Sequence, residues 1–100
     1  MFVFFDLPTK TATDRHEYSR FRRHLLKSGF LMLQKSVYTK LTINGKVFAS
    51  VIDDLRSHRP SRGSVLALLV TERQYSNITY IVGDKVEHDE IDDTESLVIL

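Results

Sequence analysis

Asp6 is the residue whose position in this sequence best suits chemistry. It follows the apolar run Phe2–Phe5, which is typical of a buried strand, and Pro8 ends that strand soon afterwards. A carboxylate at the end of a strand lies at a sheet edge, where ligands often bind. One carboxylate holds Mg²⁺ only if water, phosphate or a second copy of the chain supplies the other oxygens. The alternative is that Asp6 only forms the turn before Pro8.

A row of basic side chains is the second candidate. His16, Arg20, Arg23 and Lys27 recur at spacings of three and four, which places them on one face of a helix with no interleaved Asp or Glu. Arginine binds phosphate bidentately and lysine adds a point charge, so the row suits a nucleic-acid backbone without sequence specificity. Arg15 borders the row and is assigned to the same surface. The alternative is an ordinary solvated helix face.

Other polar side chains give weaker signals. Tyr38 could stack on a base, although a strand tyrosine more often packs in a sheet or a dimer interface. Ser36 has no nearby His–Asp arrangement, which argues against a serine hydrolase. The histidines lack metal-ligand spacing, so we expect no metal role for them; they are His16, His24, His58 and His88.

The elements that would position these residues follow from the apolar pattern. A helix is expected over Asp14–Ser28, with Thr13 as its N-cap and Gly29 as its stop. Phe30–Ile43 is strand-like with a bend or bulge at Gln34–Ser36. The next segment has helical periodicity and ends near Pro60 and Gly63; its apolar residues are Val47, Phe48, Val51, Ile52 and Leu55.

A strand at Val65–Val70, a turn at Gln74–Asn77 and a strand at Ile78–Val82 complete the body of the chain. The order resembles the ferredoxin-like βαββαβ pattern of the α+β class, with Phe2–Phe5 and Val65–Val70 as the buried central pair. We expect residues 1–83 to form this core. Residues 84–100 would form an acidic linker and a last strand, Leu97–Leu100, which closes its own sheet edge or, as we favour, adds to a neighbour's sheet in a homodimer.

Composition narrows the class of protein. The chain has 100 residues, of which 42% are hydrophobic and 27% charged, as in ordinary globular domains. It has no cysteine, which excludes disulfides and thiolate metal sites, and no apolar run suits a membrane span or a signal peptide. We therefore expect a cytoplasmic protein with no membrane partner.

The charge is divided unevenly along the chain. Residues 1–83 hold 13 of the 14 Lys and Arg and 6 of the 13 Asp and Glu, a balance of +7. Residues 84–100 hold one lysine and seven acids, a balance of −6. A basic body with an acidic end is a pattern that concerns partners rather than fold.

Five motifs together resemble one known family, the second and smaller core CRISPR-associated adaptation protein, which works with the CRISPR integrase. They are FDLPT at 5–9, RFR at 20–22, GF at 29–30, LQKSVY at 33–38 and VTERQY at 70–75. They occur in the family's order through most of the chain. The first and last motifs resemble the branch found with systems that use a single large effector nuclease, the type II systems.

The resemblance implies a ferredoxin-like fold and a symmetric dimer whose C-terminal strand adds to the partner's sheet. It implies that Asp6 binds a divalent metal, usually Mg²⁺, between the two subunits. Arg20 matches a helix arginine of the family, and Ser36 and Tyr38 match its Ser-Val-aromatic segment. Met32 departs from the pattern, because many members carry an arginine there beside the metal site.

Two functions follow from the resemblance. One is a metal-dependent endonuclease acting on RNA or DNA, with Asp6 as the catalytic residue. The other is a non-catalytic adaptor for spacer acquisition, which binds duplex DNA and bridges integrase dimers. A ribonuclease toxin of the same fold is a third possibility. The sequence favours the adaptor as the main role, because it offers one obvious catalytic carboxylate, no certain general base and a long basic row. We expect no small-molecule substrate.

Overall fold

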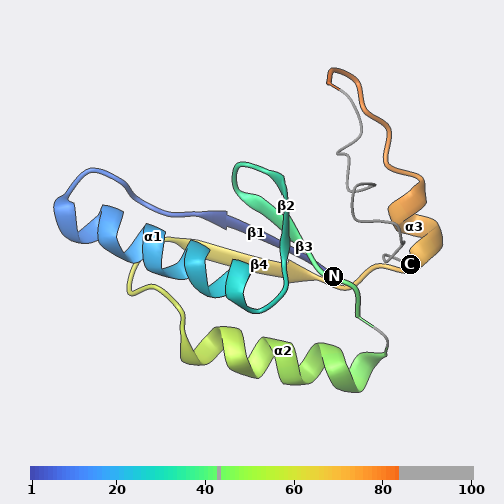
Figure 1. The fold of residues 1–100 in the computed structure, drawn as a ribbon, viewed down its shortest axis with the longest axis horizontal. Helices are drawn as coiled ribbons and strands as arrows, with labels where there is room; N and C mark the ends of the chain where they lie inside the picture. Colours follow the sequence, from blue (N-terminus) through green and yellow to red (C-terminus); the bar gives the residue numbers. More distant parts are fainter. Residues whose placement is uncertain (43, 84–100) are drawn as a thin grey trace. The chain divides into compact units, whose positions relative to one another are not determined.

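A computed structural model describes residues 1–42 and 44–83 (Figure 1). The chain forms two compact units, Met1–Leu69 and a second that begins at Val70. The first unit contains β1 (Phe2–Asp6), α1 (Ala12–Lys27), β2 (Leu31–Gln34), β3 (Val37–Thr39), α2 (Gly45–Ser57) and β4 (Ser64–Leu68). The second contains α3 (Glu72–Ser76).

The strands of the first unit form one antiparallel sheet in the order β2-β3-β1-β4. The central strand β1 pairs with β3 on one side, where Val3 lies opposite Tyr38, and with β4 on the other, where Val3 lies opposite Ala67. The order of elements along this unit is βαββαβ. The expected ferredoxin-like α+β fold is thereby confirmed.

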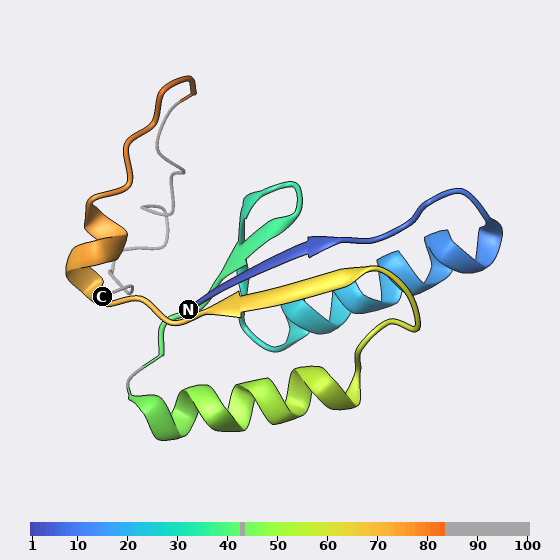
Figure 2. The same ribbon diagram turned by 180° about the vertical axis from the view of Figure 1, so that it is seen from behind.

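The core lies on one face of this sheet. Alternation along β1 turns Val3 and Phe5 toward both helices, and both side chains are buried. The Phe5 ring packs against Phe21 of α1 and Tyr38 of β3, with both centroid distances 5.5 Å. Leu55 of α2 joins the same buried cluster. The two helices therefore cover the same face of the sheet, as Figures 1 and 2 show.

The opposite face of the sheet carries apolar side chains that neither helix covers. Phe2 and Phe4 alternate with the buried residues of β1, and their rings meet edge to face at 5.9 Å. Leu66 and Leu68 of β4 lie beside them in register and are 63% and 51% exposed. Together with Val37, which pairs with Phe4, these four residues form what we call the open sheet face.

The start of α1 differs from the sequence prediction. The N-cap is Thr11 rather than Thr13, because a capping box forms two residues earlier. The Asp14 N–H donates to Thr11 Oγ1 at 3.0 Å, and the Thr11 N–H donates to Asp14 Oδ2 at 3.2 Å. The expected stop at Gly29 is confirmed by its φ of 95° directly after the helix.

Two strand predictions are corrected. The segment Phe30–Ile43 is not one bent strand but the hairpin β2–β3, with a bulge between Met32 and Gln34. Val65–Val70 is not a central buried strand, because β4 ends at Leu68 and, among the described strands, lies at the sheet edge with β1 as its one neighbour. The central pair is β1 and β3. An apolar run predicts burial, but it does not say whether a partner subunit provides it.

The second unit also differs from its prediction. Gln74 lies in a helix rather than a turn, because Thr71 and Gln74 form another capping box. The Gln74 N–H donates to Thr71 Oγ1 at 3.1 Å, and the Thr71 N–H donates to Gln74 Oε1 at 2.8 Å. Ile78–Val82 is not a strand, and Ile81 and Val82 are 87% and 90% exposed. The acidic linker and Leu97–Leu100 lie outside the described residues. No helix among residues 1–42 and 44–83 is long and apolar enough to cross a membrane.

Candidate functional site

Asp6 is the last residue of β1, where the structure places it opposite Ser64 of β4. Its side chain is exposed. Because side chains alternate along a strand, Asp6 shares its side of the sheet with Phe2 and Phe4, at the end of the open sheet face. The carboxylate therefore borders an apolar surface rather than the helical layer.

The backbone before and after Asp6 is held in place by contacts with other segments. The Phe5 N–H donates to Ser36 O at 3.1 Å, which ties β1 to the hairpin turn. Gly63 of the α2–β4 loop has a φ of +95°, and a Cβ there would lie 2.8 Å from Asp6 O and 2.8 Å from Leu7 Cδ2. The loop thus approaches the chain so closely that only glycine fits. This packing fixes the backbone that carries Asp6 while leaving its carboxylate open.

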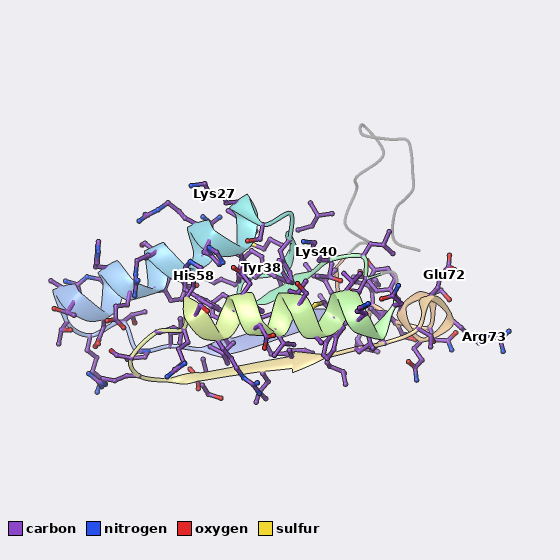
Figure 3. All side chains as sticks on the ribbon, turned by 90° about the horizontal axis from the view of Figure 1, so that it is seen from below. Lys27, Tyr38, Lys40, His58, Glu72 and Arg73 are labelled. Atoms are coloured by element: carbon purple, nitrogen blue, oxygen red, sulfur yellow. The ribbon has the colours of Figure 1, made fainter. Side chains whose placement is uncertain are left out.

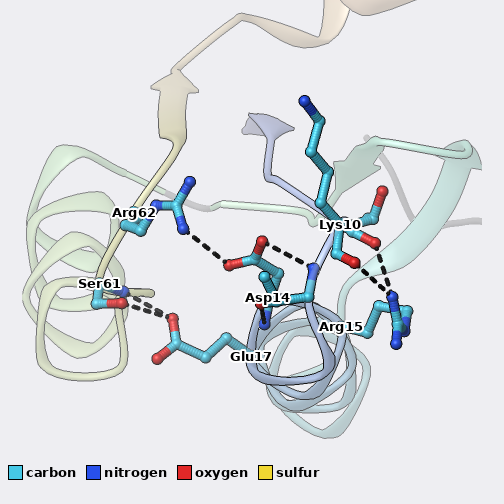
Figure 4. A network of polar contacts seen from close by, with 8 residues as sticks. Lys10, Asp14, Arg15, Glu17, Ser61 and Arg62 are labelled. Carbon is cyan, nitrogen blue, oxygen red and sulfur yellow. Dashed lines mark hydrogen bonds and ion pairs between the residues drawn. The ribbon is translucent and has the colours of Figure 1, made fainter.

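The same loop also holds the beginning of α1 (Figure 4). Arg62 Nη1 donates to Asp14 Oδ1 at 3.2 Å. The Ser61 N–H and Oγ–H donate to Glu17 Oε1 at 3.0 and 2.9 Å. Hydrogen bonds from Ser61 lower the pKa of Glu17 below its ordinary value. The Thr11 N–H, and more weakly the charge of Arg62, lower the pKa of Asp14. Three consecutive loop residues, 61–63, therefore connect α2, α1 and the end of β1.

The basic row lies on the outer face of α1. All four of its members, His16, Arg20, Arg23 and Lys27, are exposed. At 100° per residue they lie roughly opposite the buried Phe21 and Leu25, and Figure 3 shows Lys27 projecting from the side of α1 turned away from α2.

The charges of this row are mostly not neutralised by close acids. None of the ion pairs within the described part of the chain involves Arg20, Arg23 or Lys27. Glu17, the nearest acid along the helix, accepts hydrogen bonds from Ser61, and Arg20 acts on its pKa only as a minor influence. Arg15 differs from the row, because its Nη1 donates to Thr9 O at 3.2 Å and Lys10 O at 2.9 Å. It braces the β1–α1 connection.

Asp6 and the basic row are not brought together. The row faces outward from the helical layer, and Asp6 lies at the end of the open sheet face, on the other side of the sheet. A phosphate bound against Arg23 of one chain is therefore not presented to Asp6 of that same chain. The two candidate regions are separate surfaces.

Tyr38 is placed in the core. Its side chain is fully buried, its ring stacks on Phe5, and its hydroxyl has no hydrogen-bond partner among the described residues. A base cannot reach it without opening the core, so the packing alternative fits and we leave Tyr38 out of the nucleic-acid surface. Met32 lies opposite Tyr38 in register and is 46% exposed.

A cluster that sequence spacing did not reveal joins the two helices. His24 Nε2 of α1 lies 2.7 Å from Asp54 Oδ2 of α2. His58, one turn after Asp54, stacks its ring on that of His24 with centroids 3.8 Å apart. The spacing of Asp54 and His58, four residues apart, weakly indicates that they share a helix face. No pattern in the sequence predicts their contact with His24. The three residues are the one set of three possible metal ligands among the described residues.

Comparison with known proteins assigns a family. The family model described as CRISPR associated protein Cas2 matches residues 1–78. A protein of Treponema denticola named CRISPR-associated endoribonuclease Cas2 is 46% identical over 99 residues, which cover 98% of this chain and 96% of the relative. Proteins of the same name from Streptococcus mutans strain NN2025 and Campylobacter jejuni are 40% and 31% identical over 85% and 97% of this chain, and over 79% and 68% of their own lengths.

Proposed function

The chain belongs to the Cas2 family of CRISPR-associated proteins, and from this premise we propose that it acts in spacer acquisition as a homodimeric adaptor that binds duplex DNA and bridges integrase dimers. We propose further that Asp6 forms a divalent-metal endonuclease site. The observation that carries the proposal is the separation of an outward-facing basic row from a carboxylate at the end of an apolar sheet face that neither α1 nor α2 covers.

The open sheet face supports the homodimer. Leu66 and Leu68 leave more than half of their surface in water, beside Phe2 and Phe4, and such a patch is typical of an interface. A second copy is the occupant we propose, because a two-fold axis would place two identical apolar faces together. No strand among residues 1–42 and 44–83 pairs with the outer edge of β4. That edge suits strand addition, and we propose Leu97–Leu100 of the partner chain as the added strand.

Asp6 fits a metal that two copies share and does not fit one held by a single chain. Mg²⁺ requires about six oxygen ligands, and among the described residues Asp6 belongs to no group of three possible ligands. If the open sheet faces met, two Asp6 carboxylates would approach each other and repel unless a cation neutralised them. Mg²⁺, with water and a substrate phosphate as further ligands, is the cation we propose.

In this site the protein contributes position and charge. The contacts of Ser36 and Gly63 hold the backbone around Asp6, so the carboxylate needs little reorganisation to bind an ion. When bound, the ion would activate a water molecule and stabilise the charge that develops on the phosphodiester. RNA is the first substrate to test, because the relatives are named endoribonucleases.

The basic row supports binding to the DNA backbone. Arg20 and Arg23 are exposed and offer bidentate contacts to phosphate, and a dimer doubles the row. Phosphate contacts carry no base specificity, which suits a protein that must accept DNA of any sequence. Because the row and Asp6 face different sides of the sheet, DNA binding and cleavage are expected to be separable.

The experiment compares Asp6→Asn with wild type, and uses Asp53→Asn, which alters an exposed carboxylate of α2, as a matched control. Each protein is incubated with Mg²⁺ and labelled RNA or duplex DNA, and spacer integration is scored with the integrase present. We expect Asp6→Asn to lose cleavage and keep integration, and Asp53→Asn to keep both. If the wild-type protein cleaves neither RNA nor DNA, the proposed endonuclease activity is refuted. If the integrase inserts spacers equally well without this protein, the proposed adaptor role is refuted.

A further inference from the structure

The cluster of His24, Asp54 and His58 has the composition of a transition-metal site. His24 Nε2 lies 2.7 Å from Asp54 Oδ2, and His58 Nδ1 lies 3.6 Å from Asp54 Oδ1. One ligand atom from each residue can be chosen so that all three lie within 4.8 Å of one another. Two imidazole nitrogens and one carboxylate oxygen therefore converge at one place between α1 and α2, where Figure 3 shows His58.

We propose that His24, Asp54 and His58 form a binding site for a divalent transition-metal ion of the zinc type, which joins α1 to α2. Imidazole is a ligand for zinc, copper, nickel and iron, whereas Mg²⁺ takes oxygen ligands. A set of two histidines and one carboxylate with an open fourth position is a known zinc arrangement. The site is chemically distinct from the one at Asp6, and the proposal does not depend on the function proposed above.

Small side-chain movements are enough to close the site. Tetrahedral zinc with bonds of about 2.0–2.1 Å holds its ligand atoms about 3.3 Å apart. The 2.7 Å distance between His24 Nε2 and Asp54 Oδ2 must therefore widen slightly, while the longer distances between ligand atoms shorten. The two rings are stacked at 17°, and one must rotate so that both nitrogen lone pairs meet at the ion. The Asp54 and His58 side chains are 45% and 46% exposed and have room for this. His58 Nδ1 donates to the backbone oxygen of Asp54 at 2.9 Å, so His58 must either give up that hydrogen bond or bind the ion through Nε2. Water would take the fourth position.

Core packing already fixes the parts of α1 and α2 that carry the proposed ligands. Leu25, next to His24, is fully buried, and Leu55, next to Asp54, is 6% exposed. Because these leucines pack in the same cluster beneath the two helices, the ligands stand on elements that do not need to move. The ion would link residues that are thirty positions apart in the sequence. It would stabilise the helical layer without touching the basic row or Asp6.

The experiment measures metal binding directly. Protein with any affinity tag removed is titrated with Zn²⁺ by calorimetry and with Co²⁺, whose visible absorption intensifies on four-coordinate binding. Wild type, Asp54→Asn and His58→Gln are compared with Asp53→Asn, which changes a neighbouring exposed carboxylate. Circular dichroism establishes that each variant is folded. Both altered ligands are exposed at the surface, so these variants should keep the fold.

We expect one ion per chain for wild type and for Asp53→Asn. Asp54→Asn and His58→Gln should each lower the affinity by about tenfold or more, since each removes one of three ligands. At a Zn²⁺ concentration about a hundred times its Kd, the melting temperature of wild type should rise by roughly 10–20 °C. An excess of Mg²⁺ should not displace the bound Co²⁺.

Three outcomes would overturn the proposal. They are no binding of Zn²⁺ or Co²⁺ by wild type, equal loss of affinity in Asp53→Asn and Asp54→Asn, and displacement of Co²⁺ by Mg²⁺. Asp6→Asn serves as a separate check, because it should retain Zn²⁺ binding even when Mg²⁺-dependent cleavage is lost. Failure of the zinc site thus leaves the proposed function untouched, and the reverse also holds.

Discussion

Replacing Gly63 by alanine is a sensitive test of how the α2–β4 loop supports Asp6. Gly63 and Gly29 both have a φ of +95°, which strains any L residue, but their surroundings differ. A Cβ at Gly63 would meet Asp6 O at 2.8 Å and Leu7 Cα at 3.1 Å, which are backbone atoms that cannot simply rotate away. A Cβ at Gly29 would meet only Lys40 Cε at 3.7 Å and Lys40 Nζ at 3.8 Å.

The comparison of the two alanine variants isolates the clash. Each substitution carries about 1–2 kcal/mol of backbone strain, partly offset by about 0.4–1 kcal/mol from the less flexible unfolded chain. Gly29→Ala should therefore lower the free energy of unfolding by about 1 kcal/mol. Gly63→Ala adds overpacking worth about 1–3 kcal/mol, so it should be less stable than Gly29→Ala by about 2 kcal/mol.

Urea denaturation at one protein concentration measures this difference. With a slope of about 1–2 kcal/mol per molar urea, the midpoint of Gly63→Ala should fall about 1–2 M below that of Gly29→Ala. Metal-dependent cleavage should also fall in Gly63→Ala, since relief of the clash displaces the backbone of Asp6. Equal midpoints for the two variants would show that the loop does not press on β1 and that it does not hold the backbone of Asp6 rigidly.

Three further predictions concern the core, the first turn of α1 and the basic row. Tyr38→Phe should leave the free energy of unfolding unchanged or raise it by up to about 1 kcal/mol, because the buried hydroxyl finds no partner in the part of the chain that the structure describes. A loss above about 1 kcal/mol in thermal or urea unfolding would contradict this. The folded-state pKa of Asp14 lies below its ordinary 3.8, so its stabilising contribution is present above about pH 4 and is lost as the pH falls through the folded pKa. Urea midpoints measured from pH 7 down to pH 2 should therefore decline less steeply for Asp14→Asn than for wild type, and parallel curves would refute the assignment. The double change Arg20→Ala and Arg23→Ala should weaken duplex binding equally for unrelated sequences and lower the salt slope by about 2–4 in a homodimer, whereas an unchanged slope in fluorescence anisotropy would exclude the row from the interface.

The parts of the fold that sequence predicted were those that local chemistry decides. The apolar residues of β1, the spacing of Phe21 and Leu25, and the stop at Gly29 each indicated their elements, and the βαββαβ order followed from them. The cap of α1 was predicted at Thr13, whereas the structure has it at Thr11, two residues earlier. Only the reciprocal hydrogen bonds between Thr11 and Asp14 decide between them.

The features that sequence missed depend on contacts between distant segments. The apolar run of β4 predicted burial, yet within the described chain it forms a sheet edge with Leu66 exposed. The meeting of His24 with Asp54 depends on how two helices are placed over the sheet. The approach of Gly63 to Asp6 depends on loop geometry. The position of Asp6 at the end of a strand was predicted and is confirmed, whereas its metal role stays a prediction.

The central place of β1 in the sheet has a consequence for how this protein is made. The ribosome delivers β1 well before its partner strands, since Val3 pairs with Tyr38 and Phe2 pairs with Leu68. A nascent chain that stops before β4 leaves β1 with one unpaired edge and an incomplete core. Such a topology folds more slowly than one built from neighbouring segments, and unpaired apolar strands favour aggregation while synthesis continues. Truncated products that end before Leu68 should therefore be degraded or aggregate rather than accumulate as partly active fragments.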